Sequence, residues 1–175
     1  MSEPVQPPLV PSPSQTVGPF FHFCLTDTTR GQLFADRASR IVLAVRVSDG
    51  AGAPVTDAAV EIWQPSDVPG GDAAFGRLAT GDDGTVEFDT VRPCGPPGGG
   101  AAHVNVCLHA RGLLRQLYTR LYFSGDPALD GDPVMALVPE ARRRTLLATP
   151  DPARANRWVF QIRLQGQDET VFFDV

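Results

Sequence analysis

The chain of 175 residues contains no lysine, so all 15 of its basic residues are arginines. The 20 acidic residues outnumber them, and the formal net charge is −5. This balance argues against a nucleic-acid surface, because phosphate binding needs clustered basic side chains. No apolar run approaches the roughly 20 residues that a membrane span needs. We therefore expect a protein that binds neither nucleic acid nor membrane.

Cysteine is also scarce. Cys24, Cys94 and Cys107 show no CxxC spacing, and an odd number of such cysteines argues against both a disulfide framework and a zinc site. No apolar secretory segment follows the first residue, because Glu3 and several prolines interrupt the start of the chain. We expect reduced thiols in a cytoplasmic protein. Separately, the high content of Arg, Ala, Gly and Pro suggests that the source is a bacterium with a GC-rich genome.

Proline and glycine, in contrast, are abundant, with 17 residues of each. That much turn chemistry does not suit a helical bundle and favours many short strands joined by loops. Hydrophobic residues make up 42% of the chain, enough to fill one core, and the length suits one domain. The composition predicts a mainly β fold. We expect an antiparallel β-sandwich with long loops and one or two short helices.

The start of the chain differs from the rest. Residues 1–15 are rich in proline and lack periodicity, which predicts an extended arm that lies on its own domain or on a neighbour. We therefore divide the chain into an N-terminal arm and partner-contacting segment, residues 1–40, and a single β-sandwich domain, residues 41–175. No internal repeat and no second domain are visible.

Alternating apolar residues predict the strands of this domain. In one of them Val60, Ile62 and Gln64 share a face, with Glu61 and Trp63 on the other. The predicted strands are 41–47, 58–64, 85–91, 102–109, 115–123, 157–164 and 169–174, with a loop over 65–76 and a helix over 139–148 that has Pro in its first turn.

Several motifs of the chain resemble the intradiol ring-cleavage dioxygenase family. The segments that carry this resemblance are Asp49-Gly50, Pro54–Ala58, Glu61–Gln64, Asp82–Gly84, Phe88, Thr90–Pro93, His103–Asn105 and Leu121–Asp126. Two others, Ser14–Pro19 and Glu169–Asp174, are characteristic of the α-type chain of the family's two-chain enzymes. The resemblance covers nearly the whole chain, and the combination is specific although each segment alone is weak.

The resemblance implies that catalytic members hold a ferric ion with two Tyr and two His, since phenolate ligands suit a hard ion. This chain lacks that set. Its only tyrosines, Tyr118 and Tyr122, lie on one predicted strand about 13 Å apart, the metal loop 94–100 contains none, and Asn105 replaces the histidine that would follow His103. We therefore predict no metal ligand and no catalytic residue in this chain alone, and expect Fe(III) on a homologous β-type partner.

The remaining candidates have simpler interpretations. His103 is more simply a hydrogen-bonded structural histidine, and His22 a core or interface residue. Tyr118 and Tyr122 are most simply sheet residues whose hydroxyls reach a partner. The run 142–144 of three arginines is typical of a solvated helix face.

The resemblance also implies what the chain contributes to its partner. Thr16, Gly18 and Pro19 would enter the partner's pocket and shape it around the substrate, because glycine permits close approach and proline fixes the turn. Arg111 would lie at the mouth of the site, where a guanidinium suits the carboxylate of 3,4-dihydroxybenzoate (protocatechuate). From the residues alone, Gly18-Pro19 could be an ordinary turn and Arg111-Gly112 a hairpin corner.

The implied reaction is intradiol cleavage of 3,4-dihydroxybenzoate by O2 to 3-carboxy-cis,cis-muconate, a step of aromatic catabolism in the β-ketoadipate pathway. It would be performed by αβ units within a larger symmetric oligomer. Two alternatives stay open. A self-sufficient catechol or hydroxyquinol dioxygenase is disfavoured by the missing ligands. A non-enzymatic β-sandwich that binds sugar or protein would typically be secreted, and no secretory segment is visible.

Overall fold

The computed structural model describes Leu25, Thr26 and residues 30–175. In this part of the chain, eight strands form one nearly closed sheet in the order β3-β2-β5-β6-β7-β8-β1-β4. The strands are β1 (Arg40–Ser48), β2 (Ala58–Gln64), β3 (Ala74–Ala79), β4 (Thr85–Val91), β5 (His103–Ala110), β6 (Leu117–Phe123), β7 (Leu147–Pro150) and β8 (Arg157–Arg163). The helical elements are η1 (Pro127–Gly131), α2 (Pro133–Leu137), α3 (Glu140–Arg143) and η2 (Arg144–Leu146).

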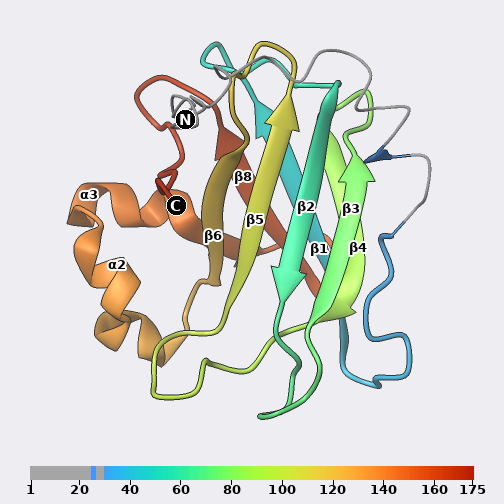
Figure 1. Ribbon diagram of the computed structural model, residues 1–175, viewed down its shortest axis with the longest axis vertical. Coiled ribbons are helices and arrows are strands. Elements are labelled where there is room, and N and C mark those ends of the chain that lie inside the picture. The colour runs from blue at the N-terminus through green and yellow to red at the C-terminus, as the bar shows by residue number, and fades with distance from the viewer. Residues whose placement is uncertain (1–24, 27–29) are drawn as a thin grey trace, which may run out of the picture.

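The sheet folds over into two layers. Strands β3, β2, β5 and β6 form the first layer, and β8, β1 and β4 form the second. The short strand β7 joins the layers by pairing with both β6 and β8. Figure 1 shows β6, β5 and β2 in front, β1 and β8 behind them, and α2 and α3 beside β6. The mainly β sandwich with short helices is therefore confirmed.

Two strand pairs depart from the antiparallel arrangement that the sequence predicted, because β1 pairs with β8 and β6 pairs with β7 in parallel. Antiparallel neighbours can be joined by a tight turn, whereas parallel neighbours need a crossover connection. The partners β1 and β8 are more than one hundred residues apart in sequence, so no local turn constrains their relative direction. Sequence alternation carries no information about direction, which is why the two parallel pairs could not be predicted.

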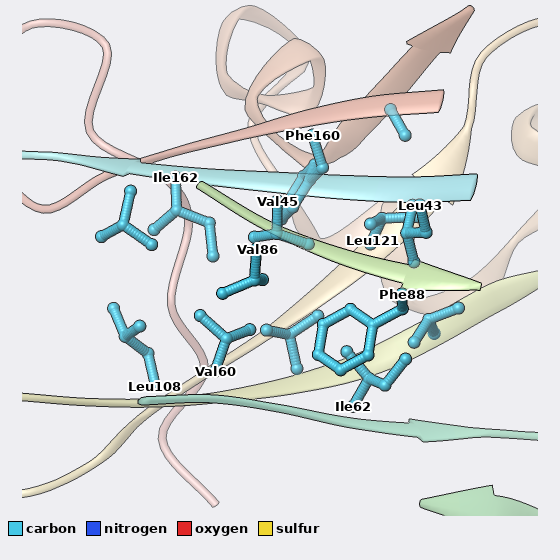
Figure 2. Packing of buried hydrophobic residues seen from close by; sticks show 14 of the residues in the cluster. Leu43, Val45, Val60, Ile62, Val86, Phe88, Leu108, Leu121, Phe160 and Ile162 are labelled. Atoms are coloured by element: carbon cyan, nitrogen blue, oxygen red, sulfur yellow. The ribbon is translucent and has the colours of Figure 1, made fainter. Parts of the chain in front are cut away.

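The core lies between the two layers, as Figure 2 shows. Successive side chains of a strand point to opposite faces, so alternate residues of each strand enter this space. Each fully buried aliphatic or aromatic side chain contributes about 1.5–3 kcal/mol relative to exposure. The labelled core residues are Leu43, Val45, Val60, Ile62, Val86, Phe88, Leu108, Leu121, Phe160 and Ile162.

The predicted faces of β2 are confirmed. Val60, Ile62 and Gln64 are buried in the interior, whereas Trp63 is 52% exposed on the other side. Gln64 is the one polar member of the inner set, and both its amide nitrogen and its amide oxygen have a hydrogen-bond partner. Its Nε2 donates to the carbonyl of Val91 at 2.6 Å, and its Oε1 accepts from the hydroxyl of Thr90 at 3.0 Å. These two bonds join β2 of the first layer to β4 of the second.

Substituting Thr90 with valine keeps the volume of this side chain but removes the donor to Gln64. The buried amide oxygen is then left without its partner, so we expect the free energy of unfolding to fall by about 1–3 kcal/mol. Urea denaturation of the full chain measures this difference, with the m-value unchanged. A denaturation midpoint equal to that of the wild type would show that the Thr90–Gln64 bond does not stabilise the fold.

Two sequence-based predictions about elements were wrong in their bounds. Strand β3 begins inside the predicted loop 65–76, since a short edge strand that contains Gly76 gives little periodic signal. The predicted helix 139–148 ends at Arg143, passes through one 3₁₀ turn and becomes β7. The apolar residues at 146–148 fit a helix or a strand equally well in sequence, and the free edges of β6 and β8 decide for the strand.

The predicted last strand, 169–174, is also absent from the described sheet. Only an isolated bridge between Tyr118 and Phe173 connects this segment to β6. Thr170 has another role, because its hydroxyl accepts a hydrogen bond from the backbone N–H of Arg163 at 3.0 Å. Hydrogen bonds therefore connect this segment to both β8 and β6. Its alternating apolar residues pack on one side, where Val171 and Phe173 contact a smaller apolar cluster, and do not form a strand.

The helical elements cover a second, smaller apolar cluster beside β6. Tyr122, Met135, Val138 and Leu146 are its larger buried members. None of the helices in the described ranges combines the length and apolar character that crossing a membrane demands. The division of the chain at residue 40 stays a prediction, although Leu33 is already buried in the main core.

Candidate functional site

The outward-facing side chains of β2, β5 and β6 form the candidate site, and we call this surface the outer face. On β5, Val104, Val106 and Leu108 point into the core. The alternate residues His103 and Asn105 therefore point to the opposite side. In Figure 1 this face of the first layer is turned towards the viewer, and α2 and α3 lie at its β6 edge.

Strand register arranges the outer face in cross-strand rows. The first row is Trp63, Asn105 and Arg120, the second is Glu61, Cys107 and Tyr118, and the third is His103 and Tyr122. Directly opposed residues of neighbouring strands have Cβ atoms about 4.5–5.5 Å apart, so members of one row interact. The register thus brings together residues from three separated segments of the sequence.

His103 is buried, and its Nδ1 lies 3.0 Å from the carbonyl oxygen of Ala101. A carbonyl can only accept, so Nδ1 carries the proton. Burial is the main reason that the pKa of His103 is lowered from 6.5, and the positive charge of Arg120 lowers it further. The ring is therefore neutral near pH 7, in agreement with the structural histidine that the sequence analysis expected.

Tyr122 shares its row with His103 and is completely buried. Its hydroxyl donates to Oδ1 of Asp132 at 3.1 Å and accepts from Nη1 of Arg120 at 3.4 Å. Burial raises the pKa of Tyr122 above its usual value of 10. Tyr122 is therefore a neutral, hydrogen-bonded phenol.

Tyr118 lies on the same strand as Tyr122, as predicted, and four residues before it. Its ring is partly exposed. Its hydroxyl accepts a hydrogen bond from Nε2 of Gln116 at 3.0 Å. The two tyrosines thus have separate partners and separate surroundings. Nothing in the described residues directs both hydroxyls to one point.

The second row contains a group of three possible metal ligands. The ligand atoms of Glu61, Cys107 and His109 lie within 4.8 Å of one another. However, the Glu61 carboxylate already binds the guanidinium of Arg77, with Nη2 at 2.6 Å from Oε1. Burial and then the charge of Glu61 raise the pKa of Cys107 to about 12. Because the guanidinium of Arg77 already binds the Glu61 carboxylate, the three residues form a polar network rather than a metal site.

We expect Cys107 to be inert in the native protein. A thiol with a pKa of about 12 forms almost no thiolate at pH 8, and the side chain is buried. In a variant with Cys24 and Cys94 changed to serine, Ellman's reagent should label Cys107 only after denaturant is added. Rapid labelling of the folded variant at pH 8 would contradict the assignment, and the Cys107→Ser variant of the same background provides the blank.

Two hollows flank His103 and Asn105. One, of about 480 Å³, is lined by Trp63, Asn105, Tyr118, Arg120, Leu137 and Phe173 together with the last residues, and we call it the outer hollow. The other, of about 440 Å³, lies between the loops around residues 65–71 and 94–97 and includes His103 in its wall. His103 and Asn105 therefore face different hollows, although only one residue separates them.

Of the predicted partner-contacting residues, the structure describes only Arg111. Arg111 follows β5 in the turn towards β6, with its side chain 64% exposed and Nε 3.1 Å from Oδ2 of Asp57. It does not line either hollow. Thr16, Gly18 and Pro19 lie outside the described residues. Sequence reasoning missed Arg120, whose position beside Asn105 depends on the register of two strands.

The sequence and the fold match a known family. A family model described as a dioxygenase matches residues 24–166. The chain therefore belongs to the intradiol ring-cleavage dioxygenase family. A protocatechuate 3,4-dioxygenase alpha chain from Burkholderia cepacia is 38% identical over 191 residues, which cover 94% of this chain and 97% of that one.

Two further relatives extend this comparison. The protocatechuate 3,4-dioxygenase beta chain of Burkholderia cepacia is 32% identical over 156 residues, covering 75% of this chain and 66% of that one. The solved dioxygenase domain of a dioxygenase–carbohydrate-binding fusion from Streptomyces sp. SirexAA-E has a TM-score of 0.63 and 25% identity, covering 90% of this chain and 100% of that one. Similarity to both alpha and beta chains indicates a heteromeric assembly.

The family depends on non-haem iron, but the described side chains do not fit that ion. A site of two tyrosinates and two histidines would use the Tyr122 hydroxyl as a ligand, whereas that hydroxyl donates a hydrogen bond to Asp132 and accepts one from Arg120. Where the resemblance implies a second histidine, this chain has Asn105, whose neutral amide suits a ferric ion poorly. The guanidinium of Arg120 lies beside both positions and repels a cation.

Proposed function

We propose that this chain is the α-type subunit of a two-chain intradiol dioxygenase that acts on 3,4-dihydroxybenzoate. O2 supplies both oxygen atoms, the bond between the two hydroxyl-bearing carbons breaks, and the product is 3-carboxy-cis,cis-muconate. The iron belongs to a homologous β-type partner. This chain supplies walls of the partner's pocket, positive charge at its entrance, and assembly surface.

The observation that carries the proposal is the 38% identity to an alpha chain over 94% of this chain. The degenerate ligand set supports the same assignment, because a chain that keeps the fold without a ferric site needs a partner for the chemistry. Asn105 and the hydrogen-bonded Tyr122 are the clearest departures from a metal-binding chain.

Arg111 has the properties that a substrate-recognising residue at the entrance requires. Its guanidinium is largely exposed and held in position by Asp57 at 3.1 Å. An arginine presents a planar pair of N–H donors that matches a carboxylate, the group that distinguishes 3,4-dihydroxybenzoate from catechol. In this proposal Thr16, Gly18 and Pro19 form the segment that enters the partner's pocket, and Arg111 binds or steers the substrate carboxylate.

The test is reconstitution. The full chain is expressed alone and together with a β-type chain, and iron content and oxygen uptake with 3,4-dihydroxybenzoate are measured for each preparation. We expect iron and turnover only in the two-chain preparation. Mutation of the iron-binding residues of the β-type chain should remove the iron from that preparation. Near-stoichiometric iron and turnover by this chain alone would overturn the proposal.

A further inference from the structure

Exposed apolar side chains of the described residues gather at one place. Six large hydrophobic residues are exposed, and four of them, Trp63, Tyr118, Leu137 and Val175, line the outer hollow. Its volume of about 480 Å³ falls within the range of about 300–1,000 Å³ that small-molecule sites occupy. Grouped exposed apolar residues around a hollow mark a binding site rather than scattered surface residues.

The aromatic wall of the hollow can hold a flat ring. Trp63 stands on β2 beside Phe75 of β3, with ring centroids 4.5 Å apart. This contact fixes the indole at the edge of the hollow, while half of its surface stays open. Tyr118 of β6 contributes a second, partly exposed ring. Aromatic rings add an attraction for another ring beyond the area they bury.

The polar end of the hollow is cationic. Arg120 forms one long hydrogen bond, from Nη1 to the hydroxyl of Tyr122 at 3.4 Å. No carboxylate of the described ranges lies within ion-pair distance of its guanidinium, in contrast to Arg111 with Asp57. The amide of its cross-strand neighbour Asn105 has no hydrogen bond to another described residue. A guanidinium that has no carboxylate partner and an amide without a hydrogen bond among the described residues therefore line the same hollow.

One acidic residue also lines the hollow, but it faces away from this end. The side chain of Asp174 is completely exposed, and its carboxylate is oriented towards Arg115, with Nη1 4.0 Å from Oδ1. The charge of Asp174 is therefore largely solvated and screened. Among the residues that line the hollow, Arg120 is the one with a cationic side chain.

We propose that the outer hollow binds an aromatic carboxylate, with the ring against Trp63 and Tyr118 and the carboxylate at Arg120 and Asn105. The fixed guanidinium supplies the positive charge that such an anion needs, so the site requires no metal. The ring fills the apolar part of the hollow, which displaces water from Trp63 and Leu137. The proposal rests on the outer face alone and does not depend on the reaction proposed above.

The test uses 4-hydroxybenzoate, which has one hydroxyl group and therefore cannot undergo cleavage between two hydroxyl-bearing carbons. The chain has two tryptophans, so labelling with 5-fluorotryptophan gives two ¹⁹F NMR signals. Trp63 reports the hollow, while Trp158 packs edge-on against Phe123 and serves as the internal control. We expect 4-hydroxybenzoate to shift the Trp63 signal saturably and to leave Trp158 unmoved. Phenol, which lacks the carboxylate, should bind about tenfold more weakly or worse.

Two variants test the cationic end. Arg120→Gln removes the charge and Asn105→Asp places a carboxylate beside it, so each should raise the Kd for 4-hydroxybenzoate about tenfold or more. Arg111→Gln removes an equal charge outside the hollow and should change the Kd less than about twofold. An unchanged Trp158 signal shows that each variant is folded.

Any of three results would overturn the proposal. These are that the Trp63 signal does not shift with 4-hydroxybenzoate, that phenol shifts it as much as 4-hydroxybenzoate does, or that Arg120→Gln binds 4-hydroxybenzoate with the Kd of the wild type. The titration is repeated on the labelled chain assembled with its unlabelled partner. A Trp63 signal that moves on assembly and then no longer responds to 4-hydroxybenzoate would assign the hollow to the partner chain and would also overturn the proposal. None of these readouts requires turnover, so they are independent of the reconstitution experiment.

Discussion

In the reconstituted two-chain enzyme, the Arg111→Gln variant is expected to have a kcat/KM for 3,4-dihydroxybenzoate about tenfold below that of the wild type. A hydrogen bond between charged groups contributes about 1.5–3 kcal/mol, and 1.36 kcal/mol corresponds to one factor of ten in rate. Because the Arg111 side chain is 64% exposed, solvent screening places the effect at the lower end of this range. Initial rates of oxygen uptake over a range of substrate concentrations provide the measurement.

A second substrate, catechol, provides the first control for Arg111. Catechol has no carboxylate, so the rate of its slower cleavage should change less than about twofold in the same variant. Arg115→Gln is the matched protein control, since Arg115 is a neighbouring exposed arginine to which the proposal assigns no role. If Arg115→Gln lowers the rate as much as Arg111→Gln, or if catechol cleavage falls equally, Arg111 does not recognise the carboxylate.

Substituting Asp132 with alanine should destabilise the fold by about 3–5 kcal/mol. The Asp132 carboxylate is 2% exposed. It accepts hydrogen bonds from the hydroxyl of Tyr122 and from three backbone N–H groups, those of Ala101, Val134 and Met135. Loss of this N-cap of α2 costs about 1 kcal/mol, and each buried donor left without a partner costs about 1–3 kcal/mol before water reaches it. Urea denaturation of the full chain measures the change.

Two further variants separate the role of this carboxylate from a general effect of mutation. Asp132→Asn keeps an oxygen acceptor at the cap and should lose about 1–2 kcal/mol. Asp130→Ala removes an exposed carboxylate from the preceding turn and should change stability by less than about 0.5 kcal/mol. Equal losses in Asp130→Ala and Asp132→Ala would show that the hydrogen bonds of Asp132 do not hold α2 against β6.

Acid should weaken the wild-type fold in two ranges of pH. Burial raises the pKa of Asp132, but the hydrogen bonds from the N–H groups of Met135 and Ala101, the hydroxyl of Tyr122 and the N–H of Val134 together lower it below 3.8. A lowered carboxyl pKa stabilises the fold above about pH 4, and this contribution is lost as the pH falls further. Burial lowers the pKa of His103, so stability also decreases as the pH falls below about 6.5. Denaturation midpoints from pH 7 to pH 3 measure both losses of stability. Asp132→Asn should remove the loss below about pH 4, and His103→Gln should remove the loss below about pH 6.5.

Much of the fold follows from local patterns. The inward set Val60, Ile62 and Gln64 was predicted because alternation along a strand depends only on neighbouring residues of the chain. The edge strand β3 and the helix α2 were not predicted, since each is short and gives little periodic signal. The position of α2 depends on the buried cap at Asp132, whose partners at residues 101 and 122 are distant in sequence.

What distinguishes this chain from a metal-binding chain can be seen in its residues without coordinates. Its two tyrosines and the asparagine at position 105 can be counted without coordinates, and the motifs around them indicate the family. The side chains that lie beside Asn105, in contrast, depend on how the strands pair in three dimensions. Arg120 faces Asn105 because β5 and β6 pair in one particular register, and a shift of one residue would turn Arg120 into the core. Register depends on the packing of the whole sheet, so no single segment of the sequence contains it.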